Sequence, residues 1–171
     1  MKNILIETIT NVCDALNKYD VKYLIIGGTA VALHGHYRIS TASDGSPLNK
    51  YDLDFWYRPG YENSLNLLKA LEELGYNVKE LKSKSPDPKK TFYSFEFDIY
   101  KADFLPSVPG LDDFMTSYNR KERYKIKEVD VYVISFDDLI ISKQTKSRSK
   151  DIEDIHNLKS KKQSNDNTLS M

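Results

Sequence analysis

The sequence has one cysteine, no excess of either charge and no long apolar run. Cys13 alone cannot form an internal disulfide, and no Cys/His cluster indicates a zinc site. A single thiol favours a reducing compartment. Lysine plus arginine equals aspartate plus glutamate at 25 each, so the overall charge predicts no partner. Affinity for nucleic acid would have to come from a local patch.

The sequence also lacks the segments that direct a chain to a membrane. No run approaches the ~18 consecutive apolar residues that a membrane-spanning helix needs. The first 20 residues are interrupted by Glu7 and Asp14 and contain no small-residue cleavage site. We therefore expect a cytoplasmic protein with no membrane partner.

The composition that is present is typical of one globular domain. Hydrophobic residues make up 40% of the 171 residues and aromatic residues 12%, enough to form a substantial core. Strand-like and helix-like segments interleave, which predicts the α/β or α+β class with a mixed sheet. We predict a single domain over residues 1–159, followed by a polar, flexible tail over 160–171.

Hydrophobic periodicity and turn residues predict the individual elements. Helices are predicted at residues 5–18, 29–35, 61–74, 111–118, 135–143 and 150–158. Strands are predicted at 21–26, 51–57, 76–81 and twice within 91–105, and 124–134 is one strand or a small hairpin. Ser135 is the predicted N-cap of the helix that follows it.

The segment YDLDFWY at 51–57 is the most informative. Side chains alternate on a strand, so Asp52, Asp54 and Trp56 share one face. Two aspartates about 7 Å apart along a strand repel each other unless a positive charge lies between them. Such carboxylates can converge on Mg²⁺ or Mn²⁺, which take oxygen ligands. The alternative is an ordinary solvent-facing edge strand, and Trp56 either packs in the core or stacks on a base.

A glycine pair upstream adds a phosphate site. Gly27 and Gly28 lie between an apolar strand and a helix, where backbone N–H groups favour anions, and Thr29 offers a hydroxyl. By itself the pair is also consistent with a simple tight turn. Glycines that contact phosphate, followed by acids that hold the bridging metal, are more specific than either feature alone.

These two segments resemble the nucleotidyltransferase superfamily. The resemblance lies in IIGGTAVALHGHYR at 25–38, with Arg38 and Thr41 in matching places, and in the acid-x-acid strand at 51–57. It extends to KADFLPSVPG at 101–110 and to the Lys, Arg and Lys-Asp of the C-terminal segment. The similarity is greatest to the minimal bacterial branch that includes abortive-infection-type toxins. It implies a nucleotidyltransferase-like mixed sheet flanked by helices, with C-terminal helices.

The resemblance also implies a mechanism and a third acid. Asp103 would join Asp52 and Asp54 as a metal ligand and act as general base, with Asp98 as the rival candidate. A hydroxyl of RNA, protein or a small molecule would attack the α-phosphorus of a nucleoside triphosphate and release pyrophosphate. Asp52, Asp54 and Asp103 are therefore the predicted catalytic and metal-binding residues, with Mg²⁺ or Mn²⁺ as cofactor.

Basic residues are predicted to neutralise the triphosphate. Arg38 follows the glycine helix, and Lys143, Arg148 and Lys150 form a cluster further along the chain. The alternative for this cluster is a solvated face. His34 and His36 lack the spacing and the third ligand of a metal site, so packing or loop hydrogen bonding is expected.

One departure from the family is the spacing of 24 positions between Gly28 and Asp52, caused by an inserted loop. Loops absorb insertions at small cost, so the predicted fold is unaffected. The departure and the short chain keep other functions open: a non-catalytic nucleotide-binding module, a toxin–antitoxin partner, or an interaction protein with a vestigial fold. Exposed strand edges and many tyrosines leave homodimerisation open.

Overall fold

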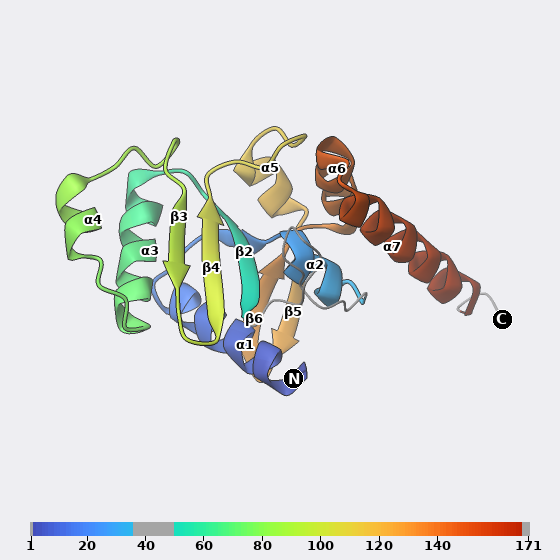
Figure 1. Cartoon of the computed structure of the whole chain (residues 1–171), viewed down its shortest axis with the longest axis horizontal. Helices are drawn as coiled ribbons and strands as arrows, with labels where there is room; N and C mark the ends of the chain where they lie inside the picture. The colour runs from blue at the N-terminus through green and yellow to red at the C-terminus, as the bar shows by residue number, and fades with distance from the viewer. Residues whose placement is uncertain (1, 36–49, 169–171) are drawn as a thin grey trace.

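Six strands form one mixed sheet in the order β3-β4-β2-β1-β6-β5 (Figure 1). This computed structural model describes the backbone of residues 2–35 and 50–168 and the side chains of residues 4–35 and 50–163. The strands are β1 Tyr23–Ile25, β2 Tyr51–Tyr57, β3 Tyr93–Glu96, β4 Tyr100–Leu105, β5 Glu122–Ile126 and β6 Val129–Val133. The helices are α1 Lys2–Lys18, α2 Gly27–Leu33, α3 Tyr61–Glu73, α4 Lys79–Lys84, α5 Phe114–Asn119, α6 Phe136–Lys146 and α7 Ser149–Thr168. The predicted class, a mixed sheet flanked by helices with C-terminal helices, is confirmed.

Strand β2 lies near the middle of the sheet, antiparallel to β1 and parallel to β4. Its register with β4 pairs Asp52 with Lys101 and Asp54 with Asp103. Because paired residues project from the same face of a sheet, these four charged side chains form a square on one face.

The opposite face of β2 forms the core. Leu53 and Phe55 are fully buried, and the Phe55 ring stacks on Phe104 with centroids 4.8 Å apart. On the acidic face, the indole of Trp56 is buried against Phe114 at 5.4 Å and donates to the carbonyl oxygen of Pro106 at 3.1 Å. Core packing, one of the two alternatives considered for Trp56, is the arrangement in the structure.

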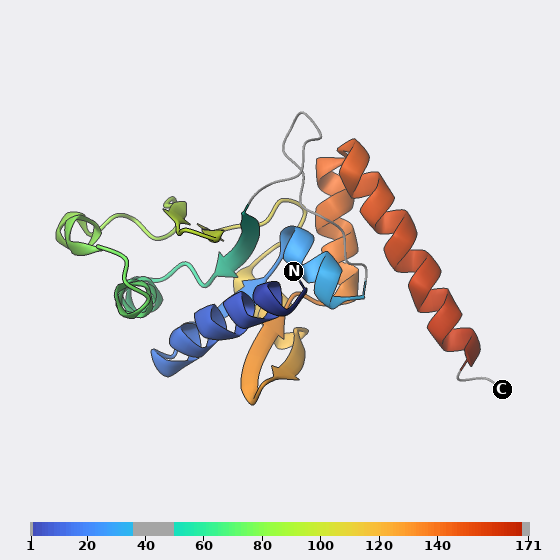
Figure 2. The ribbon, with the colours of Figure 1, turned by 60° about the horizontal axis from the view of Figure 1, so that its bottom comes forward.

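The region after α5 forms a β-hairpin and two helices. Lys127 and Glu128 have φ of 48° and 66°, the left-handed pair that a tight turn between β5 and β6 requires. The predicted strand or hairpin at 124–134 is therefore a hairpin. The Ser135 hydroxyl accepts from the backbone N–H of Asp138 at 3.2 Å, which confirms the predicted N-cap of α6. After α6 the chain reverses, and α7 extends away from the sheet (Figure 2).

Two element predictions need correction. The strand predicted at 76–81 is absent: Val78 is buried, but the following residues form the helix α4, with an ion pair of 2.5 Å between Lys84 and Glu80 one turn apart. One buried residue in a Lys/Glu-rich segment favours a surface helix over a sheet strand. The C-terminal helices are also longer than expected, because α6 continues to Lys146 and α7 to Thr168. The division into a domain at 1–159 and a tail at 160–171 stays a prediction.

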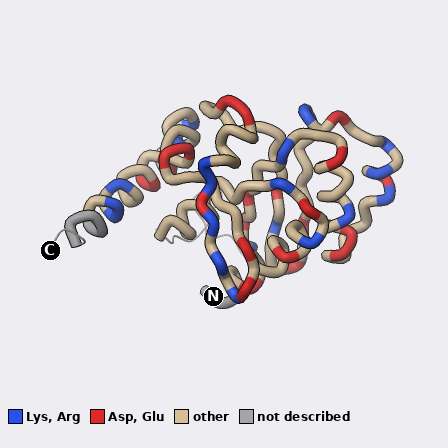
Figure 3. Tube along the Cα trace, turned by 180° about the vertical axis from the view of Figure 1, so that it is seen from behind, with Lys and Arg blue, Asp and Glu red and all other residues tan. Residues whose placement is uncertain are grey.

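The zero net charge is distributed over the molecule. Basic and acidic residues are interleaved along most elements, as the view from behind shows (Figure 3). No helix within the described residues combines the length and apolarity needed to cross a membrane. Any functional charge asymmetry must therefore be local.

Candidate functional site

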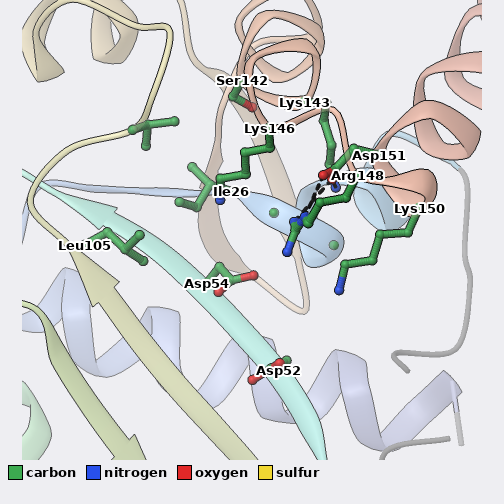
Figure 4. Close-up of a pocket in the computed structure, with 13 residues that line it drawn as sticks. Ile26, Asp52, Asp54, Leu105, Ser142, Lys143, Lys146, Arg148, Lys150 and Asp151 are labelled. Atoms are coloured by element: carbon green, nitrogen blue, oxygen red, sulfur yellow. Dashed lines mark hydrogen bonds and ion pairs between the residues drawn. The ribbon is translucent and has the colours of Figure 1, made fainter. Parts of the chain in front are cut away.

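A cavity of about 180 Å³ lies between the sheet and the C-terminal helices (Figure 4). The lining residues come from β2, the start of α2 and the residue before it, the end of β4 and the segment after it, and the α6–α7 region. They are Ile26, Gly27, Gly28, Asp52, Asp54, Leu105, Val108, Ser142, Lys143, Lys146, Arg148, Lys150 and Asp151. Seven predicted site residues thus meet at one cavity, although residues 27 and 150 are far apart in the chain.

Asp52 and Asp54, the acidic pair, occupy one wall of the cavity. Both carboxylates come from the same face of β2 and point toward the open space (Figure 4). Aspartate is unfavourable in a strand, and β2 places two of them beside a third acid in β4. The strand therefore concentrates negative charge at this wall.

Gly27 allows this wall to approach the start of α2. Its φ is +64°, and a Cβ atom built on it would lie 2.9 Å from the carboxyl carbon of Asp54. The N–H of Ile26 donates to the carbonyl oxygen of Asp54 at 2.9 Å and fixes the two segments together. A side chain at position 27 would therefore displace Asp54, so the glycine is needed for both backbone conformation and space.

The environment of Asp54 disfavours its charged form. Burial, together with the nearby charges of Asp52 and Asp103, raises the pKa of Asp54 from 3.8 to about 6. The positive charges of Lys146 and Lys143 oppose this increase. A cation bound at the acidic pair would remove this cost, since opposite charge favours the ionised carboxylate.

Asp103 lies next to the acidic pair but is not among the residues that line the cavity. Its two carboxylate oxygens accept from the Ser94 hydroxyl and the Lys101 ammonium, each at 2.7 Å. The bond to Asp103 raises the pKa of Lys101, partial burial opposes this, and the charges of Asp52 and Asp54 add to the increase. The rival candidate Asp98 is exposed in the turn between β3 and β4. Register therefore favours Asp103 over Asp98 as the third acid.

Three basic side chains form the opposite wall. Lys146, Arg148 and Lys150, here called the basic trio, extend from the end of α6 and the start of α7 toward the acidic pair (Figure 4). Lys146 and Arg148 are exposed, and Lys150 is partly buried. Positive charge facing two carboxylates across a small cavity is an arrangement that suits a polyanion carrying a metal ion.

Lys143 also reaches the cavity, but its ammonium is already engaged. It is only 4% exposed and donates to Asp151 at 2.9 Å and to Asp154 at 2.7 Å, both fully buried. These three residues are the buried charge network. Burial by itself raises the pKa of Asp151, but bonds from Arg148 and Lys143 outweigh it and lower the pKa to about 2. The network joins α6 to α7 and, through Asp151, holds Arg148 at 2.7 Å.

Thr29, the other described residue predicted to bind phosphate, contacts the acidic strand and does not line the cavity. The Thr29 hydroxyl donates to the carbonyl oxygen of Asp52 at 2.9 Å, so it braces the acidic strand against α2. Arg38, like Thr41 and His36, lies outside the described residues. His34 is described: its Nε2 donates to the carbonyl oxygen of Ile134 at 2.8 Å, because a carbonyl can only accept. His34 is thus engaged in hydrogen bonding, as its sequence context predicts.

Comparison with known protein families shows which family the chain belongs to. The family described as "Nucleotidyltransferase of unknown function (DUF6036)" matches residues 63–170, more than half of the sequence. The chain belongs to this family. The matched region begins after Gly27, Gly28 and the acidic pair, so their place in this nucleotidyltransferase fold rests on geometry. A comparison with curated proteins found no match.

One of two similar solved structures supports the fold. The chain resembles the lincosamide antibiotic adenylyltransferase LnuA, solved with lincomycin bound, with a TM-score of 0.53 and 18% identity over 86% of this chain and 91% of that one. It also matches an antigenic nucleotidyltransferase-like protein from Paracoccidioides brasiliensis, with a TM-score of 0.49 and 16% identity over 90% of this chain and 74% of that one. At such low identity, the LnuA match shows a common fold and nothing about substrate.

Sequence reasoning missed Lys146 in this member of the family. The predicted helix ended at Lys143, which left Lys146 in a loop, whereas α6 continues for one more turn. The two lysines are three residues apart on one helix, so both reach the cavity, one buried and one exposed. The available signal was the helical spacing of Leu139, Lys143 and Lys146.

The donor set suits a hard divalent cation in part. Asp52 and Asp54 offer carboxylate oxygens at the cavity, and Asp54 lies in a space that Gly27 keeps open. Among the described residues, however, no group of three His, Cys, Asp or Glu side chains is arranged to hold a metal ion. The acidic pair thus fits Mg²⁺ or Mn²⁺, while Asp103 is held by other residues.

Proposed function

We propose that this chain is a metal-dependent nucleotidyltransferase that transfers a nucleoside monophosphate from a nucleoside triphosphate to a hydroxyl acceptor. The observation that carries the proposal is the cavity itself, which has the acidic pair on one wall and the basic trio on the other. Asp52 and Asp54 hold the metal, and Gly27, Gly28 and the basic trio bind the triphosphate. Membership of the nucleotidyltransferase family supports this assignment.

In the proposed reaction, the acceptor oxygen attacks the α-phosphorus in line with the leaving group. A new oxygen–phosphorus bond forms, the bond from the α-phosphorus to the bridging oxygen of the β-phosphate breaks, and pyrophosphate leaves. Asp103 takes the proton of the acceptor hydroxyl. A divalent ion at the acidic pair supplies neutralisation of the charge that builds up on the phosphates. Lys146, Arg148 and Lys150 orient the triphosphate and neutralise its negative charge.

Transfer of label from α-labelled triphosphates tests the proposal. Each of the four triphosphates is incubated with the protein, a cell extract and Mg²⁺ or Mn²⁺. The wild type should label an acceptor, and Asp52→Asn/Asp54→Asn should lose at least about a hundredfold in rate, because metal neutralisation contributes several kcal/mol. Asp98→Asn, an exposed acid of the β3–β4 turn, is the matched control and should keep full activity. Equal labelling by the wild type and the double variant would refute the proposed nucleotidyltransferase activity.

A second candidate function is nucleotide binding without transfer. The observation that favours it is the engagement of both Asp103 oxygens by Ser94 and Lys101, which leaves no free base in the described structure at this position. Calorimetry with a non-hydrolysable triphosphate and Mg²⁺ separates the two functions. Binding that depends on the basic trio, without labelling of any acceptor, would favour the binding module. An RNA acceptor, an antitoxin partner and a homodimer stay predictions from sequence.

A further inference from the structure

Lys101 occupies an unusual place in the acidic face of the sheet. On β4 it is two residues before Asp103, and in the register it stands directly beside Asp52. Its ammonium lies 2.7 Å from Asp103 Oδ2, and its side chain is 39% exposed, against 13% for Asp103. A flexible cation with one end in solvent is therefore inserted among three carboxylates.

The neighbours of Asp103 leave Lys101 as its only cationic partner that the structure shows. The Ser94 hydroxyl, from the edge strand β3, satisfies the other carboxylate oxygen without adding charge. Lys50, which precedes β2, pairs with Glu96 at 2.8 Å. Among the described residues, Lys101 is the cation that the structure pairs with Asp103.

The contact between Lys101 and Asp103 changes the net charge of the acidic face. Asp52, Asp54 and Asp103 together carry three negative charges when ionised, and Lys101 returns one, which leaves two. One divalent cation neutralises that remainder. A second positive ion would meet the ammonium, and like charges at this range repel.

We propose that Lys101 is an internal counter-ion that holds Asp103 in the metal-free protein and competes with a divalent cation for that carboxylate. This inference rests on the proposed function. With Lys101 in place, the acidic pair is the entry point for the metal. Asp103 joins the site only when the ammonium turns out toward solvent, which its flexible stem and partial exposure permit. Lys101 is thus a residue that sets metal affinity and positions the third acid; it is not itself a catalytic residue.

Metal affinity of the nucleotide-free protein tests this inference without reference to activity. Mn²⁺ binding is followed by electron paramagnetic resonance at pH 8 for wild type, Lys101→Met and Lys101→Arg, with folding checked by thermal melting. Loss of the charge should tighten Mn²⁺ binding by roughly 3- to 30-fold, the effect of removing one positive charge near a divalent ion. Lys101→Arg keeps the positive charge and should bind Mn²⁺ as the wild type does. Lys101→Gln replaces the methionine variant if the latter does not fold.

Lys82→Met is the matched control. Lys82 is 35% exposed and pairs with Glu72 at 2.5 Å, so it resembles Lys101 in exposure and pairing, but it belongs to the helix α4 and not to the sheet. Its removal should leave Mn²⁺ affinity unchanged. This control separates a local effect of Lys101 from a general change in protein charge.

A double-mutant cycle with Asp103→Asn gives the sharper result. Asp103→Asn should weaken Mn²⁺ binding more when Lys101 is methionine than when the lysine is present, because only then is Asp103 a free ligand. Additive effects, or a Lys101→Met variant that binds Mn²⁺ no more tightly than wild type, would overturn the inference and leave the proposed function standing. Absence of Mn²⁺ binding in every variant would overturn both.

Discussion

The two walls of the cavity are built by different means. The acidic pair belongs to one strand, where alternation alone places both carboxylates on one face, and Gly27 gives Asp54 its space. The basic trio comes from the junction of α6 and α7, which Lys143 fixes through Asp151 and Asp154. One wall therefore follows from local geometry, and the other depends on a buried ionic network.

The difference separates a buried, paired lysine from an exposed one on the same helix. Lys143 and Lys146 lie on one helix and line one cavity, but Lys143 is buried between carboxylates and Lys146 is exposed. Sequence alone cannot rank the two. The structure assigns Lys143 to the scaffold of the basic wall and leaves Lys146 available for a ligand.

The largest expected effect is on this scaffold. Lys143→Met leaves two buried carboxylates without their ammonium, so the free energy of unfolding should fall by about 3–5 kcal/mol, as when one partner of a buried ion pair is removed. Urea denaturation measures the change. Lys146→Met, one turn along the helix, should stay within about 0.5 kcal/mol of wild type. Equal effects from the two lysines would contradict the separation of roles.

Removal of a charge from the acidic wall should raise the free energy of unfolding, whereas Lys143→Met lowers it. Asp54 has a folded pKa of about 6 against an ordinary value of 3.8, so the stability linked to its protonation is present below about pH 3.8 and is lost as pH rises through 6. Without metal at pH 8, Asp54→Asn should therefore raise the free energy of unfolding, by up to about 3 kcal/mol. At pH 4 the gain should be small.

Urea denaturation in chelator at the two pH values measures this difference. Asp137→Asn, an acid whose side chain is 86% exposed on α6, serves as the control and should show no such pH dependence. Addition of Mg²⁺ or Mn²⁺ at pH 8 should stabilise the wild type more than Asp54→Asn. A constant gain at both pH values would mean that burial and repulsion of the Asp54 charge are not its cause.

The next prediction concerns Gly27, where the start of α2 lies against Asp54 of the acidic strand. Gly27→Ala places a Cβ against Asp54 and imposes a left-handed backbone on a non-glycine residue, so we expect a loss of about 2 kcal/mol in the free energy of unfolding. Gly75→Ala has φ of +92° but meets nothing within 4 Å, and should lose only about 1 kcal/mol. The difference between the two variants measures the steric conflict with Asp54. Equal losses would indicate backbone strain alone.

The smallest expected effect is on ligand affinity at the basic trio. Lys146→Met and Arg148→Met should each weaken binding of a Mg²⁺-loaded triphosphate by about tenfold, or about 1.4 kcal/mol, through loss of a charge-assisted contact. Calorimetry measures the affinity, and Lys82→Met is the control. Unchanged affinity in both variants would remove the basic trio from the proposed binding site.

Much of the fold could be predicted from periodicity. The prediction located strand β2 to the residue, because Tyr51, Leu53 and Phe55 alternate with Asp52 and Asp54 and Pro59-Gly60 ends the run. The strand predicted at 76–81 failed because one buried valine within a Lys/Glu-rich segment gives no reliable period. The end of α6 was missed because its last turn is polar and exposed, so no apolar signal marks it.

The sequence by itself determined the chemistry available to this protein: two carboxylates on one strand face, a glycine pair at a helix start, and a basic cluster near the C-terminus. These depend on spacing within a few residues, which local backbone geometry converts directly into direction. Only the tertiary structure decided which charges meet. It placed Lys143 against Asp151 and Asp154 and Lys101 against Asp103, because strand register and helix packing bring together residues whose separation in sequence carries no information about contact.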